Sequence, residues 1–384
     1  MSEAKRHAVA AATVFDGWTT HKDAAVVIEG SRVAGVFAQS ELPSGLEVCK
    51  LPPNAWLAPG FIDLQVNGGG DVLFNNAPTR EAILAIAAAH RRFGTTAFLP
   101  TFITDTPEKM SAAFAAAQSL VGDAPSVLGI HLEGPFLSPE KAGVHDASLM
   151  RQPGAEDLDM LCGPRKGALL VTLAPERVPQ GCIARLAQSG VRVSLGHSMA
   201  SYAETRAAMA EGLSGFTHLF NAMRPLASRE PGPIAAALES PNAWFGMIVD
   251  GFHVDPAMLR LALRGLARPM LVTDAMPPVG GRQSRFDLYG AEIRVAEGRC
   301  ERPDGRLAGS ALDMASAVRN CVRMLDVPLE DALRFASRNP AEFIGLGHLL
   351  GSLRPGYRAD LVALSADSLE VLGTWVAGKE NGPS

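Results

Sequence analysis

Three absences limit what this chain of 384 residues can be. The five cysteines form no Cys-x-x-Cys pair, which argues against a disulfide scaffold or a thiolate zinc site and favours a reducing cytoplasm. No apolar stretch reaches the ~20 residues of a membrane span, and the N-terminal residues lack the apolar core and cleavage site of a secretory signal. The 35 basic and 40 acidic residues give a net charge of −5, which argues against binding to nucleic acid or an anionic membrane.

What the chain does have is apolar material for a large core. Hydrophobic residues make up 47% of the sequence and charged residues 20%, which excludes an extended disordered protein. The length fits two or three ordinary domains, or one barrel of about 250 residues with an appendage.

The two ends of the chain are rich in β-forming residues. Residues 24–28 and 33–37 are apolar runs separated by Glu29-Gly30-Ser31-Arg32, which predicts a hairpin. Residues 356–364 and 371–376 are short β-rich runs at the other end. We therefore expect a small discontinuous β domain built from both termini, with the body of the chain inserted between them. The expected boundaries are residues 1–58 and 349–384 for the small domain and 59–348 for the body.

The body alternates short apolar runs with Ala/Leu-rich amphipathic segments. Near-continuous apolar strands between helices are typical of a parallel sheet covered on both faces. Eight such units fit a (β/α)8 barrel better than an open sheet, which would need a Gly-x-Gly-x-x-Gly turn after its first strand. The expected strands lie in residues 61–68, 95–102, 127–134, 168–176, 192–198, 215–222, 245–253 and 270–276, and helix candidates include 79–93, 107–121, 201–211 and 255–267.

Polar side chains gather where the predicted strands end, which is the face of such a barrel that carries the active site. Glu133, His197 and His218 lie within or at the end of three different runs. One carboxylate and two imidazoles form a set that zinc takes in hydrolytic sites, with a fourth position left for water. The alternative is that each histidine is a hydrogen-bonded core residue and Glu133 pairs with an arginine. Because three candidate ligands are expected at the same level of the predicted barrel, the metal site is favoured.

Asp274 directly follows Leu271-Val272-Thr273 in the last of these runs. Its carboxylate is a further metal ligand, a general base beside the metal, or the N-cap of a following helix. Because Met276-Pro277-Pro278 opens a loop rather than a helix, the cap is disfavoured and the base is favoured.

Seven motifs, in chain order, carry a resemblance to a known family. They are PGFIDLQVNGGG (59–70), HLEGPF (131–136), GHS (196–198), THLFNAM (217–223), DGFHVD (250–255), VTDAM (272–276) and LAGSALDM (307–314). Together they closely resemble the N-acetylglucosamine-6-phosphate deacetylases of the amidohydrolase superfamily. The likeness runs from about residue 14 to residue 364; GHS alone would be weak, whereas seven motifs in register are specific.

The resemblance implies a metal-dependent (β/α)8 TIM barrel with a small β-sandwich domain formed by both termini. It also implies a homodimer and hydrolysis of the acetamide of N-acetyl-D-glucosamine 6-phosphate to D-glucosamine 6-phosphate and acetate. One divalent metal per subunit is expected, Zn²⁺ before Fe²⁺, Co²⁺ or Mn²⁺. Glu133, His197 and His218 match the metal ligands, Asp274 the catalytic acid/base, and His145 the histidine that polarises the substrate carbonyl.

The resemblance also assigns substrate contacts. The positions that match sugar contacts are Val144, Asn221, Ala222, Leu307, Ala308 and Gly309. Arg229 and His253 match phosphate-binding positions, and in the family that arginine reaches the active site of the neighbouring subunit.

One departure concerns the number of metals. Many amidohydrolases have His-x-His at the end of the first strand and hold two metals, whereas this chain has Gln65-Val66-Asn67. Amides are poor ligands for a borderline-soft ion, and no lysine ends a strand of the body to form a carboxylated bridge. We therefore expect one metal, with no tight second site at Gln65 and Asn67.

Three alternatives stay open. The N-acetylgalactosamine-6-phosphate deacetylases share these motifs, and the sequence barely separates the sugar epimers. Another amidohydrolase, such as a cyclic-amide hydrolase or a deaminase, would usually have His-x-His on the first strand. A catalytically dead barrel that senses sugar phosphates would be expected to have lost Asp274 or a metal ligand, and this chain has lost neither.

Overall fold

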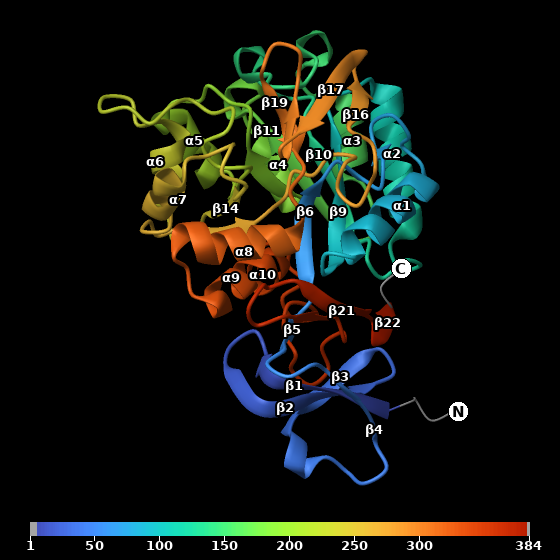
Figure 1. Cartoon of the computed structure of the whole chain (residues 1–384). Coiled ribbons are helices and arrows are strands. Elements are labelled where there is room, and N and C mark those ends of the chain that lie inside the picture. Colours follow the sequence, from blue (N-terminus) through green and yellow to red (C-terminus); the bar gives the residue numbers. More distant parts are fainter. Residues whose placement is uncertain (1–5, 382–384) are drawn as a thin grey trace.

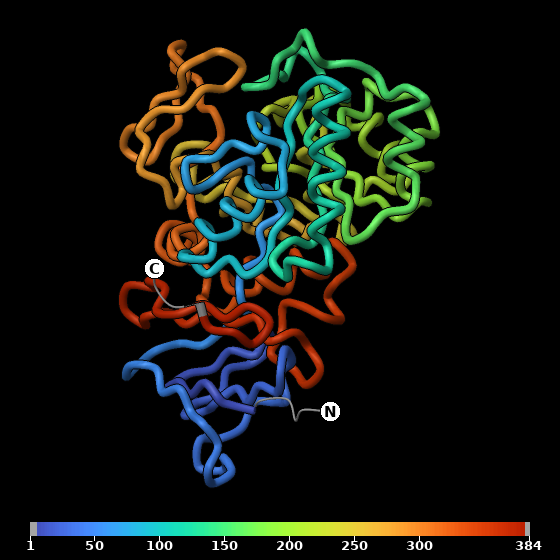
Figure 2. Tube along the Cα trace, turned by 90° about the vertical axis from the view of Figure 1, so that its right-hand side faces the viewer, coloured from blue at the N-terminus to red at the C-terminus, as the bar shows by residue number. Residues whose placement is uncertain are grey.

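The computed structural model describes residues 6–381. A large barrel and a smaller β domain lie end to end, and the strands near both ends of the chain meet in the smaller part (Figures 1 and 2). Among the described residues, no helix combines the length and the apolar character needed to cross a bilayer.

The barrel is a sheet of eight parallel strands in chain order. The strands are β6 (Phe61–Val66), β9 (Thr95–Ile103), β10 (Gly129–Glu133), β11 (Ala168–Leu173), β12 (Arg192–Leu195), β13 (Gly215–Phe216), β14 (Trp244–Met247) and β15 (Arg268–Leu271). Beyond β15 the chain closes the barrel, because Asp274 N donates to Gln65 O and Asn67 N donates to Ala275 O, both at 2.9 Å. Each predicted apolar run overlaps one of these strands, so the expected (β/α)8 barrel is confirmed.

Burial on both faces explains why these strands read as continuous apolar runs. Every residue of β6, β9 and β10 is buried, and their outward faces pack against the surrounding helices. One large apolar cluster joins the strands to the helices that cover them, so the barrel and its outer ring share one core.

The helices begin at polar capping residues. Thr79, Thr106 and Ser201 each accept a hydrogen bond from a backbone N–H of the first turn. The α-helices are α1 (Arg80–Arg91), α2 (Pro107–Leu120), α3 (Ala155–Cys162), α4 (Cys182–Gln188), α5 (Tyr202–Ala210), α6 (Gly232–Leu238), α7 (Pro256–Ala262), α8 (Met314–Leu325), α9 (Leu329–Ala336) and α10 (Arg338–Phe343). Short 3-10 helices are η1 (Gln39–Glu41), η2 (Pro139–Lys141), η3 (Ala147–Leu149) and η4 (Pro175–Arg177).

The small domain is one eight-stranded sheet made from both ends of the chain. Its strands are β1 (Arg6–Phe15), β2 (Thr20–Glu29), β3 (Arg32–Ala38), β4 (Glu47–Lys50), β5 (Trp56–Pro59), β20 (Leu361–Leu364), β21 (Val371–Val376) and β22 (Lys379–Asn381). The predicted hairpin is β2–β3, and β20 pairs with β5, which joins the two ends. The boundaries 1–58, 349–384 and 59–348 stay a prediction, and residues 1–5 and 382–384 lie outside the described residues.

A third sheet lies at the barrel mouth, where the patterns above predict no strand. It consists of β16 (Arg285–Leu288), β17 (Ala291–Ala296), β18 (Arg299–Glu301) and β19 (Leu307–Ser310), and we call residues 285–310 the rim sheet. A two-stranded hairpin of β7 (Gly68–Gly69) and β8 (Val72–Leu73) follows the first barrel strand. Met276 N donates to Ser310 O and Ser310 N donates to Asp274 O, both at 2.9 Å, so the rim sheet is tied directly to the end of the barrel.

Candidate active site

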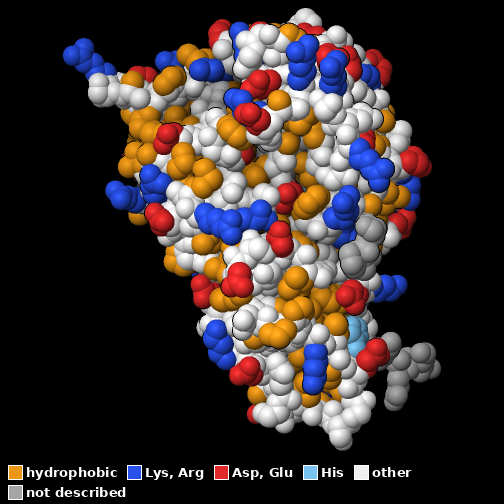
Figure 3. All heavy atoms as spheres, in the orientation of Figure 1, with side chains coloured by type: hydrophobic (Ala, Val, Ile, Leu, Met, Phe, Trp, Pro, Cys, Tyr) orange, Lys and Arg blue, Asp and Glu red, His pale blue; other side chains and the backbone are white. Residues whose placement is uncertain are grey.

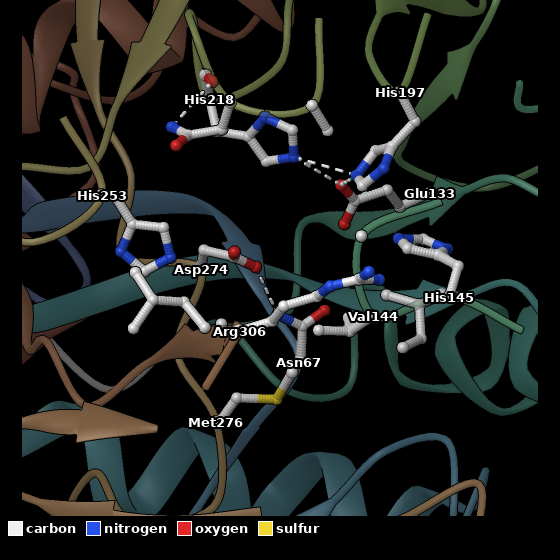
Figure 4. A pocket seen from close by; sticks show the side chains of 16 residues that line it. Asn67, Glu133, Val144, His145, His197, His218, His253, Asp274, Met276 and Arg306 are labelled. Carbon is white, nitrogen blue, oxygen red and sulfur yellow. Dashed lines mark hydrogen bonds and ion pairs between the residues drawn. The ribbon is translucent and has the colours of Figure 1, made fainter. Parts of the chain in front are cut away.

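Three side chains from different strand ends meet at the carboxyl end of the barrel. Glu133 is the last residue of β10, and His197 and His218 follow β12 and β13 by two residues. Glu133 Oε1 lies 3.1 Å from His197 Nε2 and 3.0 Å from His218 Nε2, and the two Nε2 atoms lie 3.1 Å apart. All three residues are buried, and Figure 4 shows their polar atoms pointing at one another.

The donor chemistry of this cluster fits a metal ion. His197 Nδ1 lies 2.8 Å from the carbonyl oxygen of Lys141, which can only accept, so Nδ1 carries the proton and Nε2 presents a lone pair to the cluster. Lone pairs and a carboxylate at these distances repel one another unless a cation or proton lies between them. Ligand atoms around a tetrahedral zinc lie about 3.3 Å apart, close to the spacing found here.

The charges of the cluster support the same conclusion. Burial by itself raises the pKa of Glu133, but its contacts with the rings of His197 and His218 bring that pKa well below its usual range. Burial lowers the pKa of His218, and the contact with Glu133 reverses this and raises it. The carboxylate is therefore ionised among its two imidazoles, as a metal ligand must be.

Several residues of the site have a strained backbone. His197, His218, Ala222 and Asp274 adopt positive φ angles of 48°, 33°, 47° and 52°. Each such non-glycine residue costs of order 1–3 kcal/mol and persists where the surrounding structure imposes it, which is typical of functional sites. Close packing contributes: a Cβ on Gly196, just before His197, would come 2.6 Å from the side chain of Thr172.

Asp274 faces the cluster from the segment after β15. Its Oδ1 accepts hydrogen bonds from Asn67 Nδ2 at 2.6 Å and from Gln65 Nε2 at 3.2 Å, and Gln65 Nε2 also donates to Glu133 Oε2 at 3.0 Å. Burial and the charge of Glu133 raise the pKa of Asp274 to about 6. The two amides therefore point N–H donors at the carboxylates.

His145 closes the other side of the pocket. Its Nδ1 lies 2.8 Å from Thr104 Oγ1 and 3.4 Å from the backbone nitrogen of Thr104. Because a backbone N–H can only donate, Nδ1 accepts and the proton resides on Nε2. Burial and the nearby His197 lower the pKa of His145 well below its usual value, so the ring is a neutral N–H donor at physiological pH.

The surrounding pocket has a volume of about 300 Å³. Its lining contains most of the predicted site residues: Asn67, Glu133, Val144, His145, His197, His218, Asn221, Ala222, His253, Asp274, Leu307 and Gly309. The side chain of Ala308 is instead buried in the core of the rim sheet, and Gln65 lines a separate small cavity together with Leu64 and His131. Arg229 is exposed on the segment before α6, which extends from the barrel in Figure 1, and it does not line this chain's pocket.

Other lining residues come from the rim sheet and its approach. Met276 and Arg306 both line the pocket, and the sequence motifs assign a role to neither. The signal was a series of Gly-containing turns at Tyr289-Gly290, Glu297-Gly298 and Asp304-Gly305, which separate short β-rich runs. Such spacing indicates an antiparallel meander over the mouth.

A barrel that buries one carboxylate and two imidazoles at its carboxyl end, with a further carboxylate facing them, defines the class of metal-dependent barrel hydrolases. The family model described as "Amidohydrolase family" matches residues 56–380 of this chain. The chain therefore belongs to the amidohydrolase family.

Known proteins resemble the chain over most of its length. An N-acetylgalactosamine-6-phosphate deacetylase from Shewanella sp. (strain ANA-3) is 46% identical over 84% of this chain and 82% of its own. An N-acetylglucosamine-6-phosphate deacetylase from Haemophilus influenzae is 34% identical over 97% of this chain and 99% of its own. The crystal structure of the N-acetylglucosamine-6-phosphate deacetylase from Pasteurella multocida superposes with a TM-score of 0.94 at 34% identity, covering 98% and 100% of the two chains.

Proposed function

We propose that this protein hydrolyses the acetamide of N-acetyl-D-glucosamine 6-phosphate to D-glucosamine 6-phosphate and acetate. The observation that carries the proposal is the carboxylate of Asp274 facing the Glu133, His197 and His218 cluster inside a pocket of about 300 Å³. The relatives named above support the substrate class, since both are deacetylases of N-acetylhexosamine 6-phosphates.

Different residues of the pocket have different roles in amide hydrolysis. A divalent metal held by Glu133, His197 and His218 would supply Lewis acidity and lower the pKa of water at the site. Asp274, with a pKa near 6, is ionised at neutral pH and takes the proton of the attacking water. It then delivers that proton to the amine nitrogen as the C–N bond breaks. His145 donates from Nε2 to the carbonyl oxygen as negative charge develops there.

We infer that the site holds one metal per subunit, with Zn²⁺ before Fe²⁺, Co²⁺ or Mn²⁺. Two imidazoles and a carboxylate suit zinc, although each of the other ions accepts the same donors. The argument for a single ion comes from Gln65 and Asn67, whose N–H groups are directed at Asp274, where a second metal would require lone pairs.

The protein also acts as a cytoplasmic homodimer in this proposal. Arg229 is exposed on a segment that extends from the barrel, which suits a residue that enters the partner's pocket. The free cysteines suit a reducing compartment. Should Arg229→Ala slow phosphorylated and plain sugars equally, its assignment to phosphate fails.

The galactosamine epimer is the second candidate substrate. The 46% identity to the Shewanella N-acetylgalactosamine-6-phosphate deacetylase favours it specifically. The test is acetate release from the two epimeric sugar phosphates, with and without added Zn²⁺, using Asp274→Asn as the blank. Faster release from the glucosamine epimer supports the first assignment and faster release from the galactosamine epimer supports the second. Release from neither contradicts the proposed function.

A further inference from the structure

The rim sheet brings a permanent positive charge to the active-site pocket. Among the residues of the described chain that line this pocket, Arg306 is the only lysine or arginine. In Figure 4 its side chain extends across the pocket between Asp274 and His145. The sequence motifs give this residue no role, because it precedes the LAGSALDM segment.

The backbone that carries Arg306 is firmly held over the mouth. Arg302 N donates to Arg306 O at 2.9 Å, which closes the turn between β18 and β19. Just beyond, Gly309 packs so tightly that a Cβ there would lie 2.9 Å from Asp274 O and 2.7 Å from the side chain of Met276. At the far end of the rim sheet, the hydroxyl of Tyr289 donates to Thr104 O. The backbone that carries Arg306 is therefore anchored to the segment that carries Asp274.

The guanidinium itself is free to bind a ligand. The side chain of Arg306 is 71% exposed, and its ion-pair partner is Asp304 at 3.7 Å, which is itself 49% exposed. Exposed ion pairs of this kind contribute little to stability, so Arg306 can leave Asp304 for a ligand that binds it more strongly. Figure 3 shows basic and acidic side chains interspersed on the face of the molecule that it displays.

The charge balance of the pocket explains why this arginine matters. Glu133 and Asp274 contribute two negative charges. One divalent metal would neutralise both and leave no net positive charge. His253 Nδ1 lies 2.6 Å from Asp250 Oδ2, so this pair carries no net positive charge whether or not the ring is protonated. The ion pair of His253 with Asp250 is buried, whereas that of Arg306 with Asp304 is exposed and easily exchanged. Among the residues that line the pocket, Arg306 is therefore the cation that a phosphate dianion most readily reaches.

We propose that Arg306 binds the phosphate of the substrate and selects phosphorylated over unphosphorylated N-acetylhexosamines; this rests on the proposed function. The planar guanidinium matches phosphate oxygens with two parallel hydrogen bonds, which gives geometric selectivity as well as charge. Arg306 thus supplies in cis a contact that complements the one expected in trans from Arg229 of the neighbouring subunit.

The test compares acetate release by the metal-loaded enzyme and by Arg306→Ala from an N-acetylhexosamine 6-phosphate and from the same sugar without phosphate. We expect kcat/KM for the phosphorylated sugar to fall roughly 10–100-fold, mainly through KM, with less than a threefold change for the plain sugar. Arg306→Lys should recover part of the loss, because lysine keeps the positive charge but lacks the planar guanidinium that forms two parallel hydrogen bonds. Raising the salt concentration should erode the preference of the wild type for phosphate more than that of Arg306→Ala.

Arg302→Ala is the matched control, since Arg302 lies on the same turn outside the pocket lining and should leave both substrates unchanged. An equal loss on both sugars, or no loss on the phosphorylated one, would overturn the inference while leaving the deacetylase function intact. A wild-type enzyme that releases acetate from neither sugar would instead contradict the proposed function itself.

Discussion

The barrel mouth and the rim sheet line the same pocket and are built in opposite ways. At the barrel mouth, Glu133, His197 and His218 are buried and come from separate strand ends. In the rim sheet, Arg306 is mostly exposed and comes from a turn between two short strands. The barrel residues are held by strained backbone and buried hydrogen bonds, whereas Arg306 is held by its backbone and by an exposed ion pair with Asp304.

This difference assigns separate tasks to the two regions. Groups that move protons or hold a metal need fixed geometry and a low local dielectric, which the buried strand ends provide. Groups that recognise a charged substrate must be reachable from solvent, which a turn on an added sheet provides. Changes in the barrel mouth should therefore alter the chemical step, and changes in the rim sheet should alter binding and selectivity.

The largest effect is expected for Asp274→Asn. This change keeps the shape of the side chain but removes the base, so kcat should fall about 10³–10⁴-fold. Metal content measured by mass spectrometry should stay at the wild-type level, because Asp274 is not one of the three clustered ligands. A variant that retained a tenth of the wild-type rate would show that Asp274 is not the base.

A smaller loss is expected for His145→Leu, which removes the Nε2–H donor. One lost oxyanion donor typically lowers turnover about 10²–10³-fold. Thr104→Val is the control: it deletes the hydroxyl beside Nδ1 but keeps the backbone N–H that fixes the tautomer, so its loss should be much smaller. Equal losses in the two variants would mean that His145 acts only through packing.

Tyr289→Phe tests whether the rim sheet acts on binding alone. Loss of the hydrogen bond from its hydroxyl to Thr104 O loosens the rim sheet at a cost of about 1 kcal/mol. We expect KM to rise a few-fold while kcat changes little. Tyr202→Phe, on the exterior helix α5, should change neither constant. A fall in kcat for Tyr289→Phe comparable to that of His145→Leu would contradict the assignment of chemistry to the barrel mouth and of binding to the rim sheet.

The smallest effect on turnover is expected for Asp63→Asn. Asp63 lies inside the barrel, and its Oδ2 accepts a hydrogen bond from Thr273 Oγ1 at 2.5 Å. Burial raises its pKa from 3.8 to about 7. The folded protein therefore keeps a proton that the unfolded chain loses, so the stability contributed by Asp63 is full below pH ~4 and is lost as the pH rises to ~7.

Replacing Asp63 by asparagine removes this dependence. The unfolding free energy of Asp63→Asn relative to wild type should rise by up to about 1.4 kcal/mol per pH unit across that window. Urea unfolding at pH 4 to 8 measures it, with the exposed Asp23→Asn as control. A difference that does not vary with pH would show that Asp63 titrates normally.

The barrel and the side chains at its mouth could be predicted because their signals are local. Each strand is a continuous apolar run, and Glu133, His197 and Asp274 end such runs or follow them closely. The rim sheet escaped prediction because its strands are short and half exposed, with little apolar periodicity beyond the glycine turns. The hydrogen bonds of Gln65 to Glu133 and Asp274 connect residues 68 and 209 positions apart, which sequence spacing cannot reveal.

The central claim is that Glu133, His197 and His218 together hold one metal ion with Asp274 beside it. Crystallography of chelator-rinsed, zinc-reloaded protein, with anomalous data across the zinc absorption edge, tests it most directly. We predict one anomalous peak per chain, bonded to Glu133 Oε1 and to Nε2 of both histidines. Two peaks of full occupancy, or a single peak away from these three atoms, would contradict the claim.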